Sequence, residues 1–141
     1  MIPLICVGEG EGEPGGSPGL LQEAQAEVVR QVEKCLEGVD TSREVWLAYE
    51  PVWAIGAKEP ASAKHVRGVV RAIRRSPVVK ERDAVTRILY GGSAGPGLFG
   101  RLKEEGEEEE EDGVDGLFLG RFAHEEGQFW KTICEVAEVG I

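Results

Sequence analysis

The sequence has few of the residues that build cross-links and metal sites. Among its 141 residues there are only three cysteines and two histidines. The cysteines (Cys6, Cys35 and Cys134) are odd in number, far apart and form no C-x-x-C pair. This spacing argues against a disulfide framework and gives no metal signature. We therefore expect no metal site, and a reducing compartment with the cytoplasm as the default location.

Long apolar runs are also missing. No run approaches the ~20 residues that a membrane-spanning helix needs. The N-terminal segment MIPLICVG has no basic residue, and its apolar stretch is too short for a signal peptide. The sequence thus predicts neither a membrane span nor a secretion signal.

Positive charge is scarce relative to negative charge. Lys and Arg number 16 against 26 Asp and Glu, which gives a net charge of −10 at pH 7. This balance argues against nucleic-acid partners and against docking on an anionic membrane. Most of the excess lies in residues 104–112, and without this run the chain is close to neutral. We interpret 104–112 as a solvated loop insertion, with partner binding as the alternative.

What is present is a regular alternation of strand and helix patterns within one domain, residues 1–141. Apolar runs that end at glycine or polar residues predict four strands, at residues 2–7, 45–49, 87–90 and 116–119. Amphipathic patterns predict helices over 20–36, from a cap at Ser62 to about Arg75, weakly over 98–102, and near the C-terminus. The last of these carries Phe129, Trp130, Ile133 and Ala137 on one face. Strands that alternate with helices form a parallel sheet, so we predict an α/β fold.

Four segments at the predicted strand ends carry a resemblance to a known family. Residues 48–56 read AYEPVWAIG, and residues 6–9, 90–93 and 115–120 read CVGE, YGGS and DGLFLG. The first segment resembles the catalytic loop of triosephosphate isomerase. The other three resemble, in order, the ends of strands 5, 7 and 8 of that family's (β/α)8 barrel. The resemblance covers nearly the whole chain and implies a half-barrel made of the last four βα units, strands 5–8, of a fold of ~250 residues.

The resemblance also implies roles for individual residues. Glu50 would be the general base of an aldose–ketose isomerisation through an enediol. The substrate's phosphate would be held by backbone N–H groups, which glycine-rich turns present to anions. Pro51 to Ala61 would form a mobile lid, for which this family is itself a standard example. The residues that would bind the phosphate are Gly56, Ser93, Gly120 and Arg121. The residues that would form or contact the lid are Pro51, Val52, Trp53, Ala54, Ile55 and Tyr90.

Further contacts follow from the same resemblance. Tyr90 and Ser93 would hydrogen-bond the closed lid, whereas Tyr49 and Glu9 would lie near Trp53 when the lid is open. No metal or cofactor is implied.

Several positions depart from the family pattern. The family's substrate-binding Asn and Lys and its electrophilic His belong to strands 1 and 4, which this chain does not supply. His65 and His124 do not stand at the electrophile's position, so we interpret both as surface histidines. Lys58 replaces a lid glycine, and Arg121 replaces a glycine beside the phosphate, where it either binds phosphate or points outward.

These departures leave three functions open. On the first, the chain would belong to an enzyme that interconverts dihydroxyacetone phosphate and glyceraldehyde 3-phosphate in glycolysis and gluconeogenesis, and would be inactive in isolation. On the second, it would be similar to the relatives that isomerise tetrulose phosphates, whose lid and Gly-Arg pair it resembles. On the third, it would be a non-catalytic truncated fragment that associates with other chains. Because the first and last strands would lack neighbours, we expect self-association or pairing with an N-terminal half-barrel.

Overall fold

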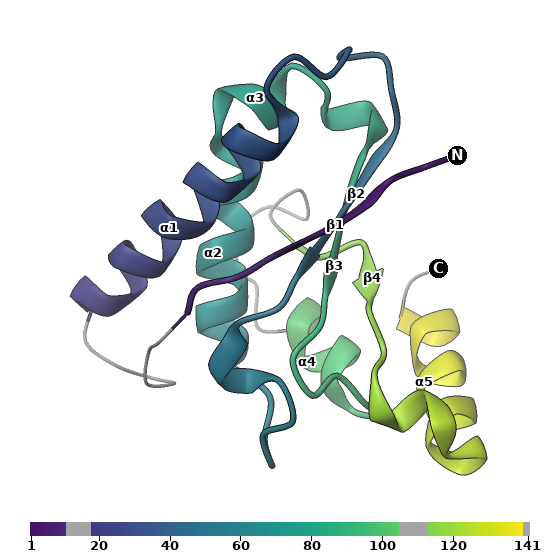
Figure 1. The fold of residues 1–141 in the computed structure, drawn as a ribbon. Coiled ribbons are helices and arrows are strands. Elements are labelled where there is room, and N and C mark those ends of the chain that lie inside the picture. The colour runs from purple at the N-terminus through teal and green to yellow at the C-terminus, as the bar shows by residue number, and fades with distance from the viewer. Residues whose placement is uncertain (11–17, 105–112, 140–141) are drawn as a thin grey trace.

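A computed structural model describes residues 1–10, 18–104 and 113–139 of the chain. In these ranges each strand is followed by a helix, as Figure 1 shows and as the alternating pattern predicts. The strands are β1 (Leu4–Val7), β2 (Val45–Tyr49), β3 (Thr86–Tyr90) and β4 (Gly116–Leu117). The helices are α1 (Pro18–Leu36), α2 (Ala63–Arg75), α3 (Pro77–Lys80), α4 (Leu98–Glu104) and α5 (Glu126–Val139), with 3-10 turns η1 (Val52–Ala54), η2 (Asp83–Val85) and η4 (Arg121–His124). Most of the predicted acidic insertion, residues 105–112, lies outside the described residues.

The four strands form one parallel sheet in the order β1-β2-β3-β4. The expected α/β fold with a parallel sheet is therefore confirmed. Three strand boundaries differ from those expected: β1 begins at Leu4 rather than at residue 2, β3 begins at Thr86 rather than at residue 87, and β4 ends at Leu117 rather than at residue 119. The ladder between β3 and β4 is short because β4 has only two residues, although the Phe118 N–H also donates to the Tyr90 carbonyl at 2.8 Å.

One face of the sheet is buried beneath helices. Side chains at alternate strand positions point to this face and are almost inaccessible to water. Burial of each such large apolar side chain stabilises the fold by about 1.5–3 kcal/mol. They include Val45, Leu47, Tyr49, Ile88 and Tyr90 from the strands, and Val28, Val32, Val66, Val69 and Ile73 from α1 and α2.

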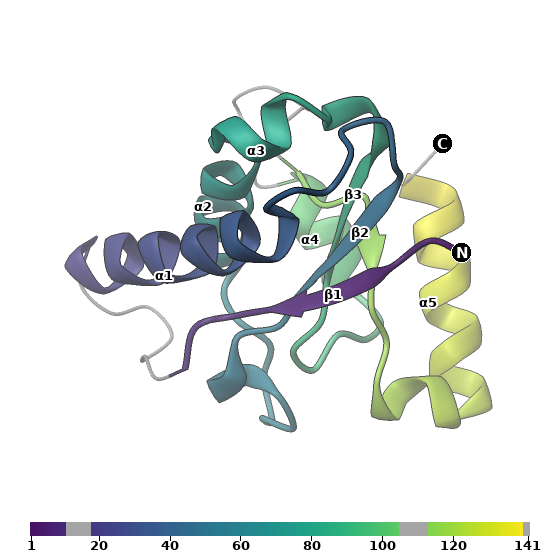
Figure 2. The same cartoon turned by 45° about the horizontal axis from the view of Figure 1, so that its top comes forward.

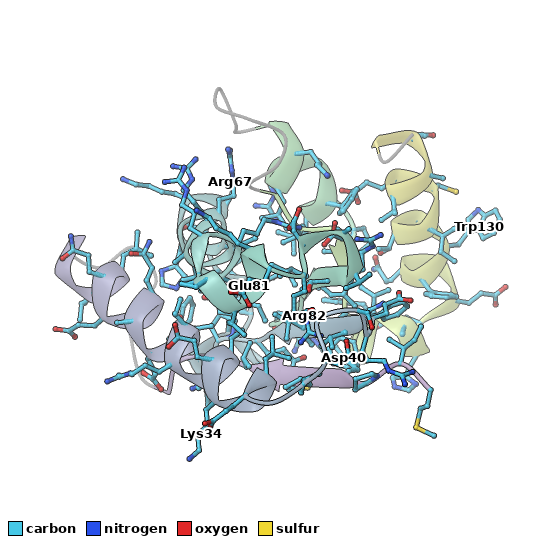
Figure 3. The ribbon with its side chains drawn as sticks, turned by 90° about the horizontal axis from the view of Figure 1, so that it is seen from above. Lys34, Asp40, Arg67, Glu81, Arg82 and Trp130 are labelled. Atoms are coloured by element: carbon cyan, nitrogen blue, oxygen red, sulfur yellow. The ribbon has the colours of Figure 1, made fainter. Side chains whose placement is uncertain are left out.

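The helices are arranged in an arc on the outer side of the strands. Figure 2 shows α1, α2 and α3 together beside the sheet, with α5 at the opposite end of the molecule. Figure 3, seen from above, shows α1, α2, α4 and α5 succeeding one another around the strands. Gln25 of α1 donates to the Gly68 carbonyl of α2 at 2.9 Å and so joins the first two helices of the arc.

The other face of the sheet is open to solvent. Leu4 and Trp46 keep 42% and 38% of their surface exposed, and Cys6 and Arg87 are also exposed. The nearly all-apolar run at residues 2–7 suggests a strand buried on both faces, but β1 is shielded on one face only. These four side chains remain in contact with solvent, whereas the small Ala48, in the middle of the same face, is buried.

Helix α5 shows the same incomplete burial. The residues that formed its predicted apolar face remain in solvent, with Phe129 and Ile133 at 41% exposure and Trp130 at 65%. Figure 3 shows the Trp130 side chain pointing away from the rest of the molecule. The helix is instead held to the core through Val136 and to α4 through Glu135, whose carboxylate accepts hydrogen bonds from Gly97 N and Gly100 N.

Helix α2 begins where the sequence predicts. The Ser62 side chain accepts a hydrogen bond from the His65 backbone N–H at 3.2 Å, which is the expected N-cap. Of the helices in the described ranges, none is both long enough and apolar enough to cross a membrane.

Candidate active site

The residues that carry the family resemblance meet at one edge of the sheet. Glu9 follows β1, Glu50 follows β2, Gly91 to Ser93 follow β3 and Gly120 follows β4. Because all four strands are parallel, their carboxyl ends lie together, which is where ligand sites form in α/β folds. The order of the strands thus brings together segments that are up to 111 positions apart between Glu9 and Gly120.

Glu50 lies in a narrow space between the ends of β1 and β3. Its backbone N–H donates to the Val7 carbonyl at 2.8 Å, and Gly91 N donates to the Tyr49 carbonyl at 2.8 Å. A Cβ on Gly8 would lie 1.9 Å from the Glu50 carbonyl oxygen, and one on Gly91 would lie 2.4 Å from Glu50 Cγ. Gly8 therefore leaves room for the Glu50 backbone, and Gly91 leaves room for its carboxylate.

The environment of Glu50 suits a proton acceptor. Burial against the sheet edge raises the pKa of its carboxyl group above the ordinary value. Among the described residues none forms an ion pair or a side-chain hydrogen bond with this carboxylate. A carboxylate that is partly desolvated and unpaired is more basic than one in water, as general base catalysis requires.

Residues 51–61 form a compact loop over this edge, the segment predicted to be the lid. The buried Pro51 begins it, and η1 places Trp53 and Ala54 toward the protein, while Val52 and Ile55 are 55% and 56% exposed. At its far end the Ala61 N–H donates to the Tyr90 hydroxyl at 3.0 Å. The two exposed aliphatic side chains are available to cover a ligand at the sheet edge.

Trp53 is held at the base of the loop by Glu9. The indole Nε1 donates to Glu9 Oε1 at 3.1 Å, and the Tyr49 hydroxyl lies 3.2 and 3.1 Å from the two carboxylate oxygens. A third residue, His65, brings its Nε2 to 2.7 Å from Oε1. Burial alone would raise the pKa of Glu9, but the hydrogen bonds from His65 and Trp53 and the proximity of His65 outweigh it and lower the pKa.

The interpretation of His65 as a surface histidine was therefore wrong. Its side chain is only 12% exposed and Glu9 is 2% exposed, so the two form a partly buried pair. The sequence carried no signal for this contact, since 56 positions separate the two residues. His124, by contrast, is exposed in η4, as expected.

Ser93 holds the middle of the loop. It has a left-handed backbone with φ of 58°, which a non-glycine residue rarely adopts. Its hydroxyl lies 3.0 Å from the Ala54 carbonyl and 2.8 Å from the Ala57 carbonyl. The contacts that the resemblance assigned to a closed lid, through Ser93 and Tyr90, are thus formed together with the Trp53–Glu9 contact assigned to an open lid.

Arg121 connects the segment after β4 to the same loop. Its guanidinium donates to the Gly56 carbonyl at 3.3 Å and the Ala57 carbonyl at 2.5 Å, and lies 3.4 Å from Ser93 Oγ. It also lies over the Phe122 ring, 5.1 Å from the centroid. The side chain therefore turns toward the loop, and Gly56, Ser93 and Arg121 lie close together. The binding of phosphate by these three residues stays a prediction.

Gly120 is exposed at the start of η4, and its carbonyl accepts from Ala123 N at 3.0 Å. Its predicted use in phosphate binding stays a prediction. In the described part of the chain no group of three His, Cys, Asp or Glu residues has the arrangement of a metal site.

A partly buried carboxylate at the carboxyl edge of a parallel sheet, unpaired among the described residues and beneath a loop held at both ends, marks a candidate ligand site in an α/β protein. Residues 1–137 match the family model for triosephosphate isomerase. The chain belongs to the triosephosphate isomerase family.

Two kinds of relative appear among the most similar curated proteins. An L-erythrulose-1-phosphate isomerase from Pectobacterium atrosepticum is 37% identical over 92% of this chain and 46% of the relative. One from Mesorhizobium japonicum is 40% identical over 87% of this chain and 45% of the relative. A triosephosphate isomerase from Xanthobacter autotrophicus is 38% identical over 85% of this chain and 44% of the relative. The chain thus spans less than half the length of the relatives it matches.

The position of Glu50 yields a testable prediction. A Gly91→Ala variant places a methyl carbon 2.4 Å from Glu50 Cγ and Oε1, so the carboxylate must turn toward solvent. Because burial is what raises its pKa, we expect the Glu50 carboxyl pKa to fall toward the ordinary value, measured by carbon NMR titration. Gly127→Ala is the control, since nothing lies within 4 Å of a Cβ there. An unchanged Glu50 pKa in Gly91→Ala would contradict this account.

The lowered pKa of Glu9 predicts a pH dependence of stability. The folded state binds this proton less readily than the unfolded state, whose Glu pKa is about 4.3. The stabilisation from Glu9 is therefore present above that pH and is lost as pH falls through the lower folded pKa. We expect Glu9→Gln to cost about 1.5–3 kcal/mol at neutral pH, the usual size for hydrogen bonds to a charged group, and less in acid.

Urea unfolding between pH 7 and pH 3 measures this difference. Glu23→Gln is the control, because Glu23 is exposed on α1. If the Glu9→Gln and native proteins lost stability in parallel as pH fell, the assignment of Glu9 would be wrong.

Proposed function

We propose that the protein to which these residues belong is an isomerase that interconverts an aldose and a ketose phosphate of three or four carbons. The observation that carries the proposal is Glu50, a partly buried carboxylate of raised pKa at the carboxyl edge of the sheet. Membership of a family whose similar members are named as such isomerases supports it.

The proposed chemistry is a proton transfer between neighbouring carbons. Glu50 takes a proton from the hydroxyl-bearing carbon beside the substrate's carbonyl, and the electron pair of that C–H bond forms a C=C bond to the carbonyl carbon, whose oxygen becomes an enediolate. A proton then passes from the neighbouring hydroxyl to that oxygen. The carboxylic acid returns its proton to the former carbonyl carbon while the other carbon becomes the new carbonyl, so that no atom is gained or lost. The exposed Val52 and Ile55 cover the intermediate and exclude water while Glu50 is protonated.

The phosphate is placed where Gly56, Ser93 and Gly120 present their backbone N–H groups. Arg121 adds a cation to this place, because its guanidinium lies beside Ser93 and the carbonyls of Gly56 and Ala57. An arginine can bind phosphate with two N–H groups while its charge attracts the anion. On this proposal Arg121 exchanges loop carbonyls for phosphate oxygens when substrate binds.

Dihydroxyacetone phosphate, converted to glyceraldehyde 3-phosphate, is the first candidate substrate. L-erythrulose 1-phosphate is the second candidate substrate. Two of the most similar relatives are named L-erythrulose-1-phosphate isomerase, which favours testing it.

We further propose that the described chain by itself turns over these substrates slowly. Isomerisation needs donors that stabilise the oxygen of the enediolate, and loss of one such donor costs roughly 2.7–4 kcal/mol. No described cation or imidazole is found in contact with Glu50, so these donors are proposed to come from the first half of a family barrel.

A chimera tests the catalytic assignment. The first half of the Pectobacterium relative, joined to this chain, should isomerise dihydroxyacetone phosphate or L-erythrulose 1-phosphate in a coupled assay. Glu50→Gln should lower kcat about 10²–10⁴-fold, the usual contribution of a general base, while Glu44→Gln, on an exposed residue before β2, should not. A folded chimera that kept full activity after Glu50→Gln would refute the role.

We also propose that the open face of the sheet is covered by a second half-barrel, and that in the purified chain this is a second copy. A twofold axis parallel to the strands would set β4 of each copy beside β1 of the other with all strands parallel. The exposed apolar residues Leu4 and Trp46 and the unpaired outer edges of β1 and β4 in the described chain support this arrangement.

Sedimentation at micromolar concentration tests the association. We expect a dimer, and we expect Trp46→Glu to dissociate it by placing a charge on the open face. Val39→Glu is the matched control, because Val39 is 36% exposed and Trp46 is 38% exposed, but Val39 lies in the loop after α1. A stable native monomer of 15.3 kDa would refute self-association, whatever the variants did.

A further inference from the structure

We propose that His65 is a positioning residue that fixes the Glu9 carboxylate and thereby holds Trp53 at the base of the lid. The inference rests on the proposed role of residues 51–61 as a lid. Its direct observation is the contact between His65 Nε2 and Glu9 Oε1. At 2.7 Å it is shorter than the contacts of the Glu9 carboxylate with Tyr49 and Trp53, which are 3.1 to 3.2 Å.

His65 is well placed to act on both ends of the loop. Trp53 lies near the start of the loop, whereas His65 lies in the first turn of α2, directly after its end. Both side chains bind the same oxygen of Glu9. The carboxylate therefore joins the beginning of the loop to the helix that follows it.

The backbone around His65 is itself held firmly. Its N–H donates to Ser62 Oγ at 3.2 Å, and the preceding Ala61 N–H donates to Tyr90 Oη at 3.0 Å. His65 therefore has a fixed origin from which to orient Glu9. The rings of His65 and Trp53 also meet edge to face, with centroids 5.3 Å apart and planes at 79°.

The chemistry of Glu9 explains why a third donor matters. A carboxylate that is 2% exposed must be hydrogen-bonded, because burying an unpaired charge is costly. If Trp53 moves away with the lid, Tyr49 and His65 are the side chains in the described chain that still donate to Glu9. His65 thus keeps the carboxylate charged and oriented to receive Trp53 again.

The test follows the indole N–H of Trp53 in the purified chain by NMR, with no substrate present. Its signal is assigned by its loss in Trp53→Phe. We expect His65→Leu to speed hydrogen exchange of this N–H by about tenfold to a hundredfold, the effect of losing one hydrogen bond to a charged group. His65→Gln, which can still donate an N–H to Glu9, should restore exchange to near the native rate.

Two references separate lid positioning from general stability. His124→Leu changes the exposed histidine of η4 and should leave the indole exchange unchanged. The backbone amides of Leu47 and Ile88, in the central strands, should exchange at native rates in every variant. An unchanged or slower indole rate in His65→Leu would overturn the proposal, and so would a uniform rise that included these amides. Because the readout needs no turnover, failure of the isomerase proposal in the chimera would remain distinguishable from failure of this one.

Discussion

The buried carboxylate of Glu9 is the interaction on which the rest of the site depends. It lies at the end of β1 and accepts hydrogen bonds from β2 through Tyr49, from the loop through Trp53 and from α2 through His65. Its backbone carbonyl also accepts from Val52 N at 3.0 Å. One charged group, removed from water, thus joins four segments, because each donor offsets part of the cost of burying it.

Glu9 can act in this way because its own backbone is held in place. Gln31 of α1 forms a pair of hydrogen bonds with Gly8, from its side-chain nitrogen to the carbonyl and from the Gly8 N–H to its side-chain oxygen, both at 2.9 Å. Gly8 also has to be glycine for Glu50 to pass beside it. The same residue therefore orients the carboxylate that holds the loop and leaves room for the backbone of the proposed base.

The two carboxylates at this edge show how environment separates their properties. Glu9 and Glu50 both lie where a strand ends, and burial acts on both. Hydrogen bonds from His65 and Trp53 and the proximity of His65 lower the pKa of Glu9, whereas burial without such donors raises that of Glu50. One is suited to remain ionised and hold structure, and the other is suited to accept a proton.

Local pattern by itself determined the four strands, the helices that follow them and the family, but not the short helix α3. Each of these signals lies within one short stretch of the chain, so hydrophobic periodicity and local similarity suffice to recognise it. Examples are the apolar runs before Gly8 and Gly91, the Ser62 cap and the AYEPVWAIG segment. The exposure of Trp46 and of the α5 face was not readable in this way, because burial depends on which surfaces other segments cover. Only the tertiary structure decided that His65 binds Glu9 and that Arg121 turns toward the loop, since these contacts join residues 56 and 64 positions apart. Such contacts arise from the parallel order of the strands, which sets distant chain segments side by side at one edge of the sheet.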